Sequence, residues 1–200
     1  MTAPTMPSPS EHPQHALIER DTRAWLERAV IGLNLCPFAK AVHVKGQIHF
    51  VVSTADDGRE LLDDLARELQ ALDAIDPAVR STTLLIAPDC LADFLAFNDL
   101  LGRADKLLRR LKLVGTLQVA SFHPRYQFAG TDPDDIGNFT NRAPYPTLHL
   151  LRESSIDQAV RSFPQAEQIF EQNIRTLERL GPEGWAGLDV GPSIDETPPR

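Results

Sequence analysis

Chemically capable side chains gather in one stretch of this 200-residue chain, residues 122–153. Imidazole and carboxylate groups occur there together, in His123, Asp132, Asp134, Asp135 and His149. His123 with Asp134 or Asp135 suits a general base. His123, Asp132 and His149 suit a divalent transition metal, which lowers the pKa of a bound water to about 7. The spacing matches no compact zinc signature, and the alternative is ordinary turn chemistry and packing, because Asp-Pro-Asp-Asp is common in turns.

A second set of side chains in the same stretch suits an anionic small molecule. Guanidinium groups match carboxylate or phosphate oxygens bidentately, amides complete such a pocket, and a tyrosine ring can stack on a flat ligand. The set comprises Arg125, Tyr126, Asn138, Asn141, Arg142 and Arg152. The alternative is that the arginines pair with aspartates of the loop and hold it in place, although such surface pairs contribute only about 0 to 1 kcal/mol each.

Cys36 is a third candidate, as a nucleophile. A helix that begins after Pro37 would lower the thiol pKa, whereas the end of the preceding helix would raise it. A thiol of pKa about 8.5 is only a few per cent ionised at neutral pH, so a reaction needs a neighbour such as His123. The alternative is a buried free thiol, which we also expect for Cys90.

Composition restricts the class of protein. With 200 residues, 42% of them hydrophobic, we expect one domain over residues 14–187 and disordered tails at 1–13 and 188–200. The net charge of -8 disfavours general nucleic-acid binding. There is no apolar run of about 18 residues and no secretory signal, so we expect no membrane partner and a cytoplasmic location.

Apolar periodicity predicts an alternation of helices and strands. Helices are expected at about 14–33, 57–76, 88–111, shortly after Ser154 or Ser155, and 164–180; strands are expected at about 47–53, 82–87, 113–122 and 147–152. The third helix should bury the stripe Leu91, Phe94, Leu95, Leu101, Leu108 and Leu111. Right-handed crossovers make the first three strands parallel, with the fourth returning beside the third. The expected fold is α+β or α/β, a mixed sheet of about four strands and about five helices, as a ferredoxin-like sandwich or a small three-layer sheet.

Some segments are unusual enough to indicate a family. They are Trp25-Leu26, Val30-Ile31-Gly32-Leu33-Asn34-Leu35-Cys36-Pro37-Phe38-Ala39, residues 123–131 and residues 141–153. In this order they resemble DUF1415, a bacterial family of unknown function, over nearly the whole chain except its tails. The resemblance implies a bacterial, cytoplasmic, single-domain protein. It implies no activity, cofactor or catalytic residue.

The leading hypothesis is therefore a small cytoplasmic hydrolase that acts on an anionic small molecule at the 122–153 stretch, with a metal as an optional participant. Two alternatives remain open. One is a module that binds a metabolite or metal without chemistry. The other is a protein-interaction factor whose long loop docks onto a partner, which a large exposed apolar patch would favour.

Overall fold

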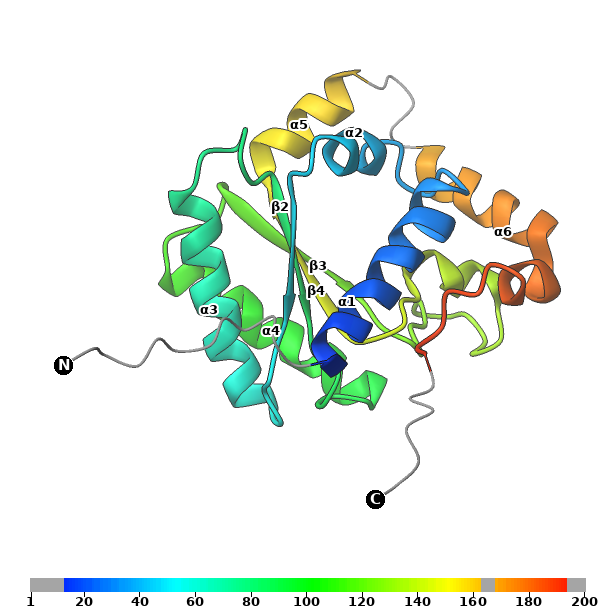
Figure 1. Ribbon diagram of the computed structural model, residues 1–200, viewed down its shortest axis with the longest axis horizontal. Coiled ribbons are helices and arrows are strands. Elements are labelled where there is room, and N and C mark those ends of the chain that lie inside the picture. The colour runs from blue at the N-terminus through cyan, green and yellow to red at the C-terminus, as the bar shows by residue number, and fades with distance from the viewer. Residues whose placement is uncertain (1–12, 163–167, 194–200) are drawn as a thin grey trace.

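The computed structural model describes residues 13–162 and 168–193. A four-stranded sheet lies between two layers of helices (Figure 1). In chain order the elements are α1 (Pro13–Trp25), the π-helix η2 (Leu26–Ile31), α2 (Ala39–Val44), β1 (Ile48–Val52), α3 (Gly58–Ala74), β2 (Thr82–Ile86), α4 (Phe94–Arg110), β3 (Leu117–Phe122), the 3-10 helix η3 (Ile136–Asn141), β4 (Thr147–Arg152), α5 (Glu153–Ser162) and α6 (Ile169–Ala186).

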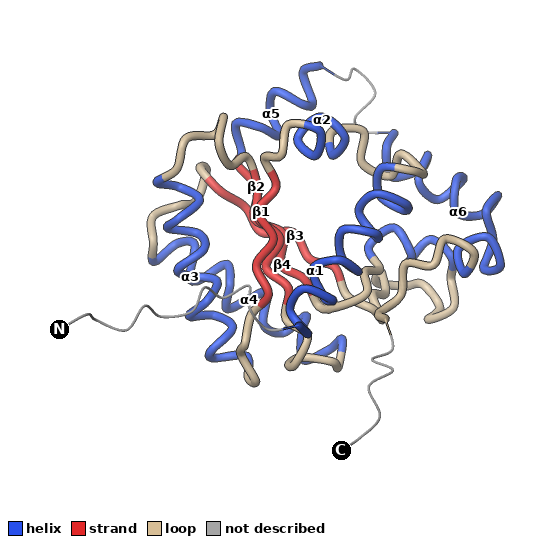
Figure 2. Tube along the Cα trace, viewed as in Figure 1, coloured by secondary structure: helices blue, strands red, loops and turns tan. Residues whose placement is uncertain are grey.

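The sheet is mixed, with the strand order β1-β2-β4-β3. Its strands, red in Figure 2, lie at the centre of the fold with helices on either side. β1 and β2 pair in parallel, and β4 runs antiparallel to both β2 and β3. The first three strands therefore share one direction, and the fourth returns beside the third, as predicted. Of the two arrangements left open by the sequence, the structure has the three-layer sheet.

Different helices cover the two faces of the sheet. Alternate residues of a strand point to opposite faces, so Leu148 and Leu150 pack with the leucines of α3 and with Phe97 of α4. On the other face, Phe50 and Phe122 pack with Trp25 and the rest of the α1–η2 layer. Trp25 is 2% exposed and lies in the core between the sheet and this layer.

α3 begins as expected, because the side chain of Asp57 accepts hydrogen bonds from the backbone N–H groups of Arg59 and Glu60. α4 differs from the prediction. It begins at its cap Asp93 rather than near Pro88, because Leu91 has a φ of 57°, which no right-handed helix contains. Its buried residues are Phe97, Leu100, Ala104, Leu107 and Leu108. The predicted stripe was therefore wrong at Leu95, which is 70% exposed.

The first helix is continuous over its predicted length but changes type at Leu26. The N–H of Gly32 donates to the carbonyl of Glu27 at 2.9 Å, five residues back, which is the π-helical spacing. Asn34 follows the segment with a φ of 55°, a left-handed conformation that is common where helices end. The short helix α2 that follows was not predicted.

Residues 188–193, expected to belong to a disordered tail, pack against the rest of the fold. Gly181, with a φ of 67°, interrupts α6 at the predicted stop, but a further helical turn follows it to Ala186. Val190 is 6% exposed, and Ser193 donates two hydrogen bonds to Asp21 of α1. The expected helix start at Pro164 lies outside the described residues, as do most of the expected N-terminal tail and residues 194–200. None of the described helices is long and apolar enough to cross a bilayer.

Candidate functional site

The long loop between β3 and β4 is held by its own polar side chains. Asn138 is 0% exposed. Its Oδ1 accepts from the N–H of Phe128 at 2.9 Å and the hydroxyl of Thr131 at 2.8 Å, and its Nδ2 donates to the carbonyl of Asp132 at 2.8 Å. Asn141 likewise donates to the carbonyl of Ser121 at 3.2 Å. Both amides, predicted as ligand-binding groups, are thus used to fix the loop.

His123 lies inside the core, with no exposed surface. Its Nδ1 accepts a hydrogen bond from the N–H of Arg125 at 3.0 Å, so Nε2 carries the proton and donates to the carbonyl of Leu91 at 3.0 Å. The ring lies 5.1 Å from Phe97, centroid to centroid. Burial lowers the pKa of His123, which keeps the ring neutral. Both nitrogens are engaged, which leaves none for the predicted base or metal ligand.

The predicted metal ligands are not brought together. His149 sits on β4, where its Nε2 lies 2.8 Å from Oγ1 of Thr82, and burial lowers its pKa to about 4. Asp132 is exposed on the loop, and Asp135 caps η3 through the N–H of Gly137 at 2.7 Å. Within residues 13–162 and 168–193, no group of three or more His, Cys, Asp or Glu side chains is placed to hold a metal ion.

Arg152 lies away from the other predicted residues, whereas Cys36 packs against the buried cluster that contains Trp25 and Ala143. One guanidinium nitrogen of Arg152, Nη2, donates to the carbonyls of Leu72 at 2.6 Å and Ile75 at 2.7 Å, where α3 ends. This is the end of β4 opposite to Thr147, which the loop joins, so Arg152 is roughly 16 Å along the strand from it. Burial raises the pKa of Cys36, and this outweighs hydrogen bonds from backbone N–H groups.

Three of the predicted residues do meet, at a pocket of about 440 Å³. Its lining comes from the first turn of α4 and from both arms of the loop: Asp93, Phe94, Leu95, Arg125, Gln127, Pro133, Asp134 and Arg142. Arg125, Asp134 and Arg142 were predicted from the sequence. Tyr126 packs behind this wall, with its ring 5.2 Å from that of Phe94.

Arg142 is the better buried of the two arginines. Its Nη2 donates to the carbonyl of Pro133 at 2.5 Å, and its Cζ lies 4.1 Å from the centre of the Phe139 ring. Burial lowers its pKa, and nearby Asp134 opposes that effect. These contacts fix the guanidinium group, so its orientation exists before any ligand arrives.

Arg125 lies across the pocket at the start of α4. Its Nη2 donates to the carbonyl of Ala92 and lies 3.8 Å from Oδ2 of Asp93, while the side chain stays 64% exposed. Asp93 caps the helix through the N–H of Ala96 at 3.0 Å. The first turn of a 17-residue helix carries partial positive charge, so two cations and a helix N-terminus converge here.

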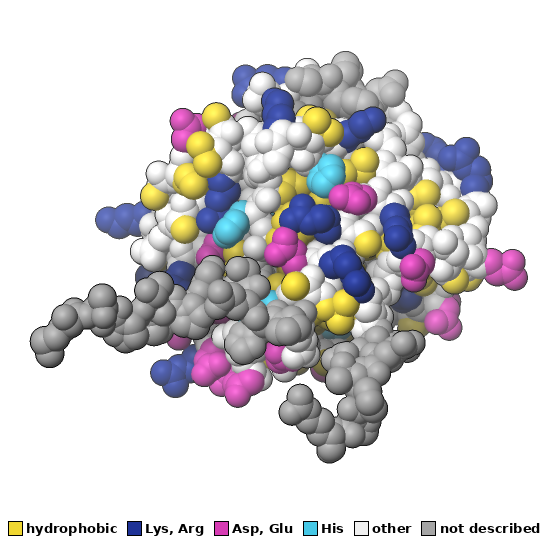
Figure 3. Space-filling view, viewed as in Figure 1, with side chains coloured by type: hydrophobic (Ala, Val, Ile, Leu, Met, Phe, Trp, Pro, Cys, Tyr) yellow, Lys and Arg dark blue, Asp and Glu magenta, His cyan; other side chains and the backbone are white. Residues whose placement is uncertain are grey.

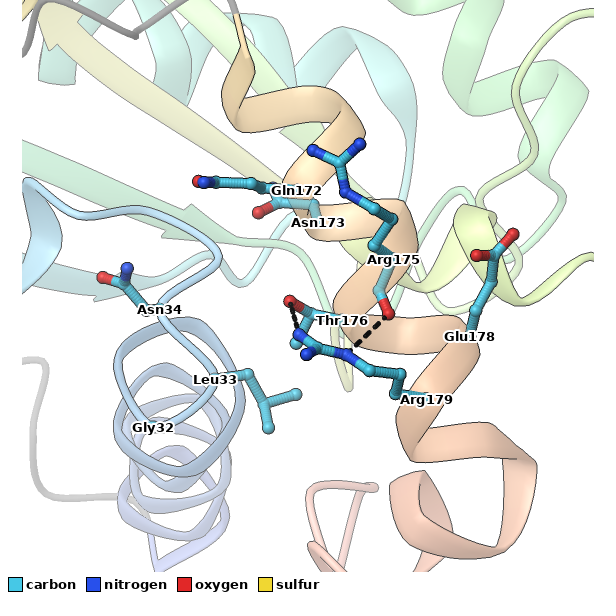
Figure 4. A pocket seen from close by; sticks show the side chains of 9 residues that line it. All are labelled: Gly32, Leu33, Asn34, Gln172, Asn173, Arg175, Thr176, Glu178 and Arg179. Atoms are coloured by element: carbon cyan, nitrogen blue, oxygen red, sulfur yellow. Dashed lines mark hydrogen bonds between the residues drawn. The ribbon is translucent and has the colours of Figure 1, made fainter.

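A larger pocket of about 830 Å³ lies between the turn at Gly32–Asn34 and α6 (Figure 4). Its charged side chains, Arg175, Glu178 and Arg179, all come from one helix, and the two arginines find partners within that helix. Arg175 lies 3.6 Å from Glu171, and Nε of Arg179 donates to the carbonyl of Arg175 at 3.2 Å. Such contacts are typical of a solvated helix face. The smaller pocket, whose charges come from separate segments, is therefore the stronger candidate.

Sequence reasoning missed the α4 side of the site. Asp93, Phe94 and Leu95 precede the loop by about thirty residues and come to it only through the fold. The helix-cap pattern at Asp93 was the available signal. On the face seen in Figure 3, basic, acidic and apolar side chains are interspersed.

The chain belongs to the family described as "Protein of unknown function (DUF1415)", whose model matches residues 17–187. This confirms the resemblance seen in the sequence. No curated protein and no solved structure matches the chain.

Proposed function

We propose that this member of the DUF1415 family binds an anionic small molecule in the pocket between the first turn of α4 and the loop. The observation that carries the proposal is the convergence of Arg125, Arg142 and the N-terminus of α4 on one concavity. Guanidinium groups and free backbone N–H groups are the donors that carboxylate and phosphate oxygens prefer. The free thiols Cys36 and Cys90 fit the cytoplasmic location that we propose with it.

The donors that remain are suited to this task. Arg142 uses Nε and Nη2 for carbonyls of the loop, and Arg125 uses Nη2 for the carbonyl of Ala92. The Nη1 groups of both arginines make no hydrogen bond to a described residue. The first turn of α4 also leaves the N–H groups of Phe94 and Leu95 without an intrahelical acceptor.

The test is titration calorimetry with inorganic phosphate and small carboxylates. We expect binding by the native chain, and a loss of at least about tenfold in Arg125→Gln, because one charge-assisted contact is worth about 1.5 to 3 kcal/mol. Lys106→Gln, which removes the same charge from an exposed position of α4, is the matched control. If the two variants behaved alike, the anion would be responding to net charge and the pocket proposal would fail.

Hydrolysis is the second candidate, and one observation favours it. Asp134, one of the predicted general bases, lines the same pocket as the two arginines, whereas His123 does not. In that reaction the carboxylate would take a proton from water as the water oxygen attacks a carbonyl carbon or phosphorus. It would then give that proton to the departing alkoxide, which leaves as an alcohol. Turnover of acyl or phosphate esters that Asp134→Asn abolishes, with binding retained, would support this candidate.

A further inference from the structure

The pocket carries two positive and two negative side chains, Arg125 and Arg142 against Asp93 and Asp134. A multiply charged anion such as phosphate would be attracted by one pair and repelled by the other. From this balance we infer that the pocket takes a zwitterion, a small molecule with a carboxylate and an ammonium group, of the kind found in an α-amino acid with an apolar side chain. The inference rests on the proposed function, and it narrows the class of ligand.

The two carboxylates differ in whether their oxygens already have partners. Both oxygens of Asp93 have one, because Oδ1 accepts a hydrogen bond from the N–H of Ala96 at 3.0 Å and Oδ2 lies 3.8 Å from Arg125. Asp134 is exposed, and its carboxylate makes no hydrogen bond to any residue that the structure describes. Its charge acts on Arg142, which also lines the pocket. The geometry therefore assigns the ammonium group to Asp134, which has acceptors to spare.

The carboxylate end of the ligand would be bound by the two arginines. Arg142 is fixed in place by the carbonyl of Pro133 and the ring of Phe139, and it still offers Nη1. Arg125 offers Nη1 and Nε beside the first turn of α4. A carboxylate bound between them would face two cations and a helix N-terminus, while an ammonium group in that place would be repelled.

An apolar wall completes the pocket. Phe94, Leu95 and Pro133 belong to its lining, and Leu95 is 70% exposed in the free protein. An exposed leucine beside fixed charges gives an apolar side chain of the ligand a surface to cover. The volume of about 440 Å³ lies in the lower part of the range for small-molecule sites, roughly 300 to 1,000 Å³.

The opposing explanation is that the four charges neutralise one another as a surface network. Two observations speak against it as a complete account. The Arg125–Asp93 distance of 3.8 Å is long, and both side chains are about two-thirds exposed, so the pair contributes roughly 0 to 1 kcal/mol. Asp134 feels the charge of Arg142 but forms no ion pair within 4.0 Å among the described residues, so its carboxylate oxygens remain available to a ligand.

The test compares three probes that share the isobutyl side chain of leucine by titration calorimetry: leucine, isocaproate, which lacks the amino group, and isoamylamine, which lacks the carboxylate. We expect leucine to bind at least about tenfold more tightly than either analogue, because only leucine satisfies both charged ends. Asp134→Asn should remove this preference while leaving the affinity for isocaproate unchanged or higher. Asp105→Asn, an exposed carboxylate on α4 outside the pocket, should change neither value.

The outcomes separate the two proposals. Isocaproate or phosphate binding as tightly as leucine, with a dependence on Arg125, would overturn the zwitterion and leave the anion site standing. The zwitterion would also be overturned if Asp134→Asn kept the full preference for leucine. If none of the probes, phosphate included, bound to the native chain, both proposals would be rejected. Circular dichroism of each variant shows whether a lost signal reflects a lost fold.

Discussion

The Nε2 atom of His123 lies 3.0 Å from the carbonyl oxygen of Leu91, a residue held at a φ of 57°. A branched side chain in the left-handed region is strained by about 1 kcal/mol or more, and it persists only where the surroundings hold it. The hydrogen bond from His123 is one such restraint. Because Leu91 lies two residues before the helix cap Asp93, the buried histidine positions the helix end that lines the pocket.

His123→Ala should therefore act on stability. The change leaves the carbonyl of Leu91 and the N–H of Arg125 without partners, and it opens a cavity beside Phe97. We expect a loss of about 3 to 5 kcal/mol, measured by urea denaturation, from two unpaired groups and the cavity together. His49→Ala, at an exposed position of β1, is the control and should cost less than about 1 kcal/mol. A His123→Ala protein as stable as the native chain would contradict the core role.

Arg152 and Arg125 were both predicted to bind the ligand, but their substitution should affect different properties of the protein. Arg152→Met removes the donor to the carbonyls of Leu72 and Ile75 inside the protein, and we expect a loss of about 2 to 4 kcal/mol with ligand affinity unchanged. Arg125→Gln, at a position that is 64% exposed, should change stability by less than about 1 kcal/mol and should weaken anion binding. Urea denaturation measures the stability of both variants, and calorimetry measures their anion affinity. Weaker anion binding by Arg152→Met, or a large loss of stability in Arg125→Gln, would contradict these roles.

His149 should make stability depend on pH above the carboxylate range. Its pKa is about 4 in the folded protein and about 6.5 in the unfolded chain, so the unfolded state binds more protons between these values. Stability is therefore complete above about pH 6.5 and falls as the pH drops toward 4, by at most about 3 kcal/mol from this group. His149→Gln should reduce the loss measured by urea denaturation between about pH 7 and pH 4.5. An unchanged loss would show that His149 is accessible to protons in the fold.

The two cysteines should be poor nucleophiles in the folded protein. Burial raises the pKa of Cys36, and burial together with nearby aspartates raises that of Cys90 to about 11. Only the thiolate reacts with iodoacetamide, so native Cys90 should be labelled at least about a hundredfold more slowly than in urea, and native Cys36 should also be labelled more slowly than in urea. Intact mass and peptide mapping give both rates. Labelling of native Cys36 faster than in urea would restore it as a candidate nucleophile.

The elements that the sequence predicted correctly are those determined by residues within the element itself. β4 was predicted at its observed bounds because its residues alternate in polarity. α3 was predicted to start at its observed cap because Asp57 and the helical apolar period lie within that segment. The start of α4 was misplaced because a contact from His123, distant in the chain, holds Leu91 outside the helix. The same reason limits the site prediction. Nothing near Arg152 in the sequence shows that its partners are carbonyls at the end of α3.

Asp21 joins three distant segments, and its removal should affect stability in a separate pH range. It is 4% exposed on α1 and accepts from the hydroxyl of Tyr145 at 2.9 Å and from the N–H and hydroxyl of Ser193, each at 2.7 Å. Burial alone would raise the pKa of Asp21, but these hydrogen bonds outweigh it and lower the pKa overall. Its contribution is thus present above the unfolded pKa, about 4, and is lost as the pH falls through the folded value.

Two variants test this junction. Tyr145→Phe removes one charge-assisted hydrogen bond and should cost about 1.5 to 3 kcal/mol near neutral pH. Asp21→Asn should also lose stability there, and as the pH falls below about 4 its free energy of unfolding, measured by urea denaturation, should decrease less steeply than that of the native chain. Asp105→Asn, an exposed carboxylate of α4, should keep the native slope. Equal slopes in Asp21→Asn and the native chain would mean that the junction with Ser193 does not hold Asp21 ionised.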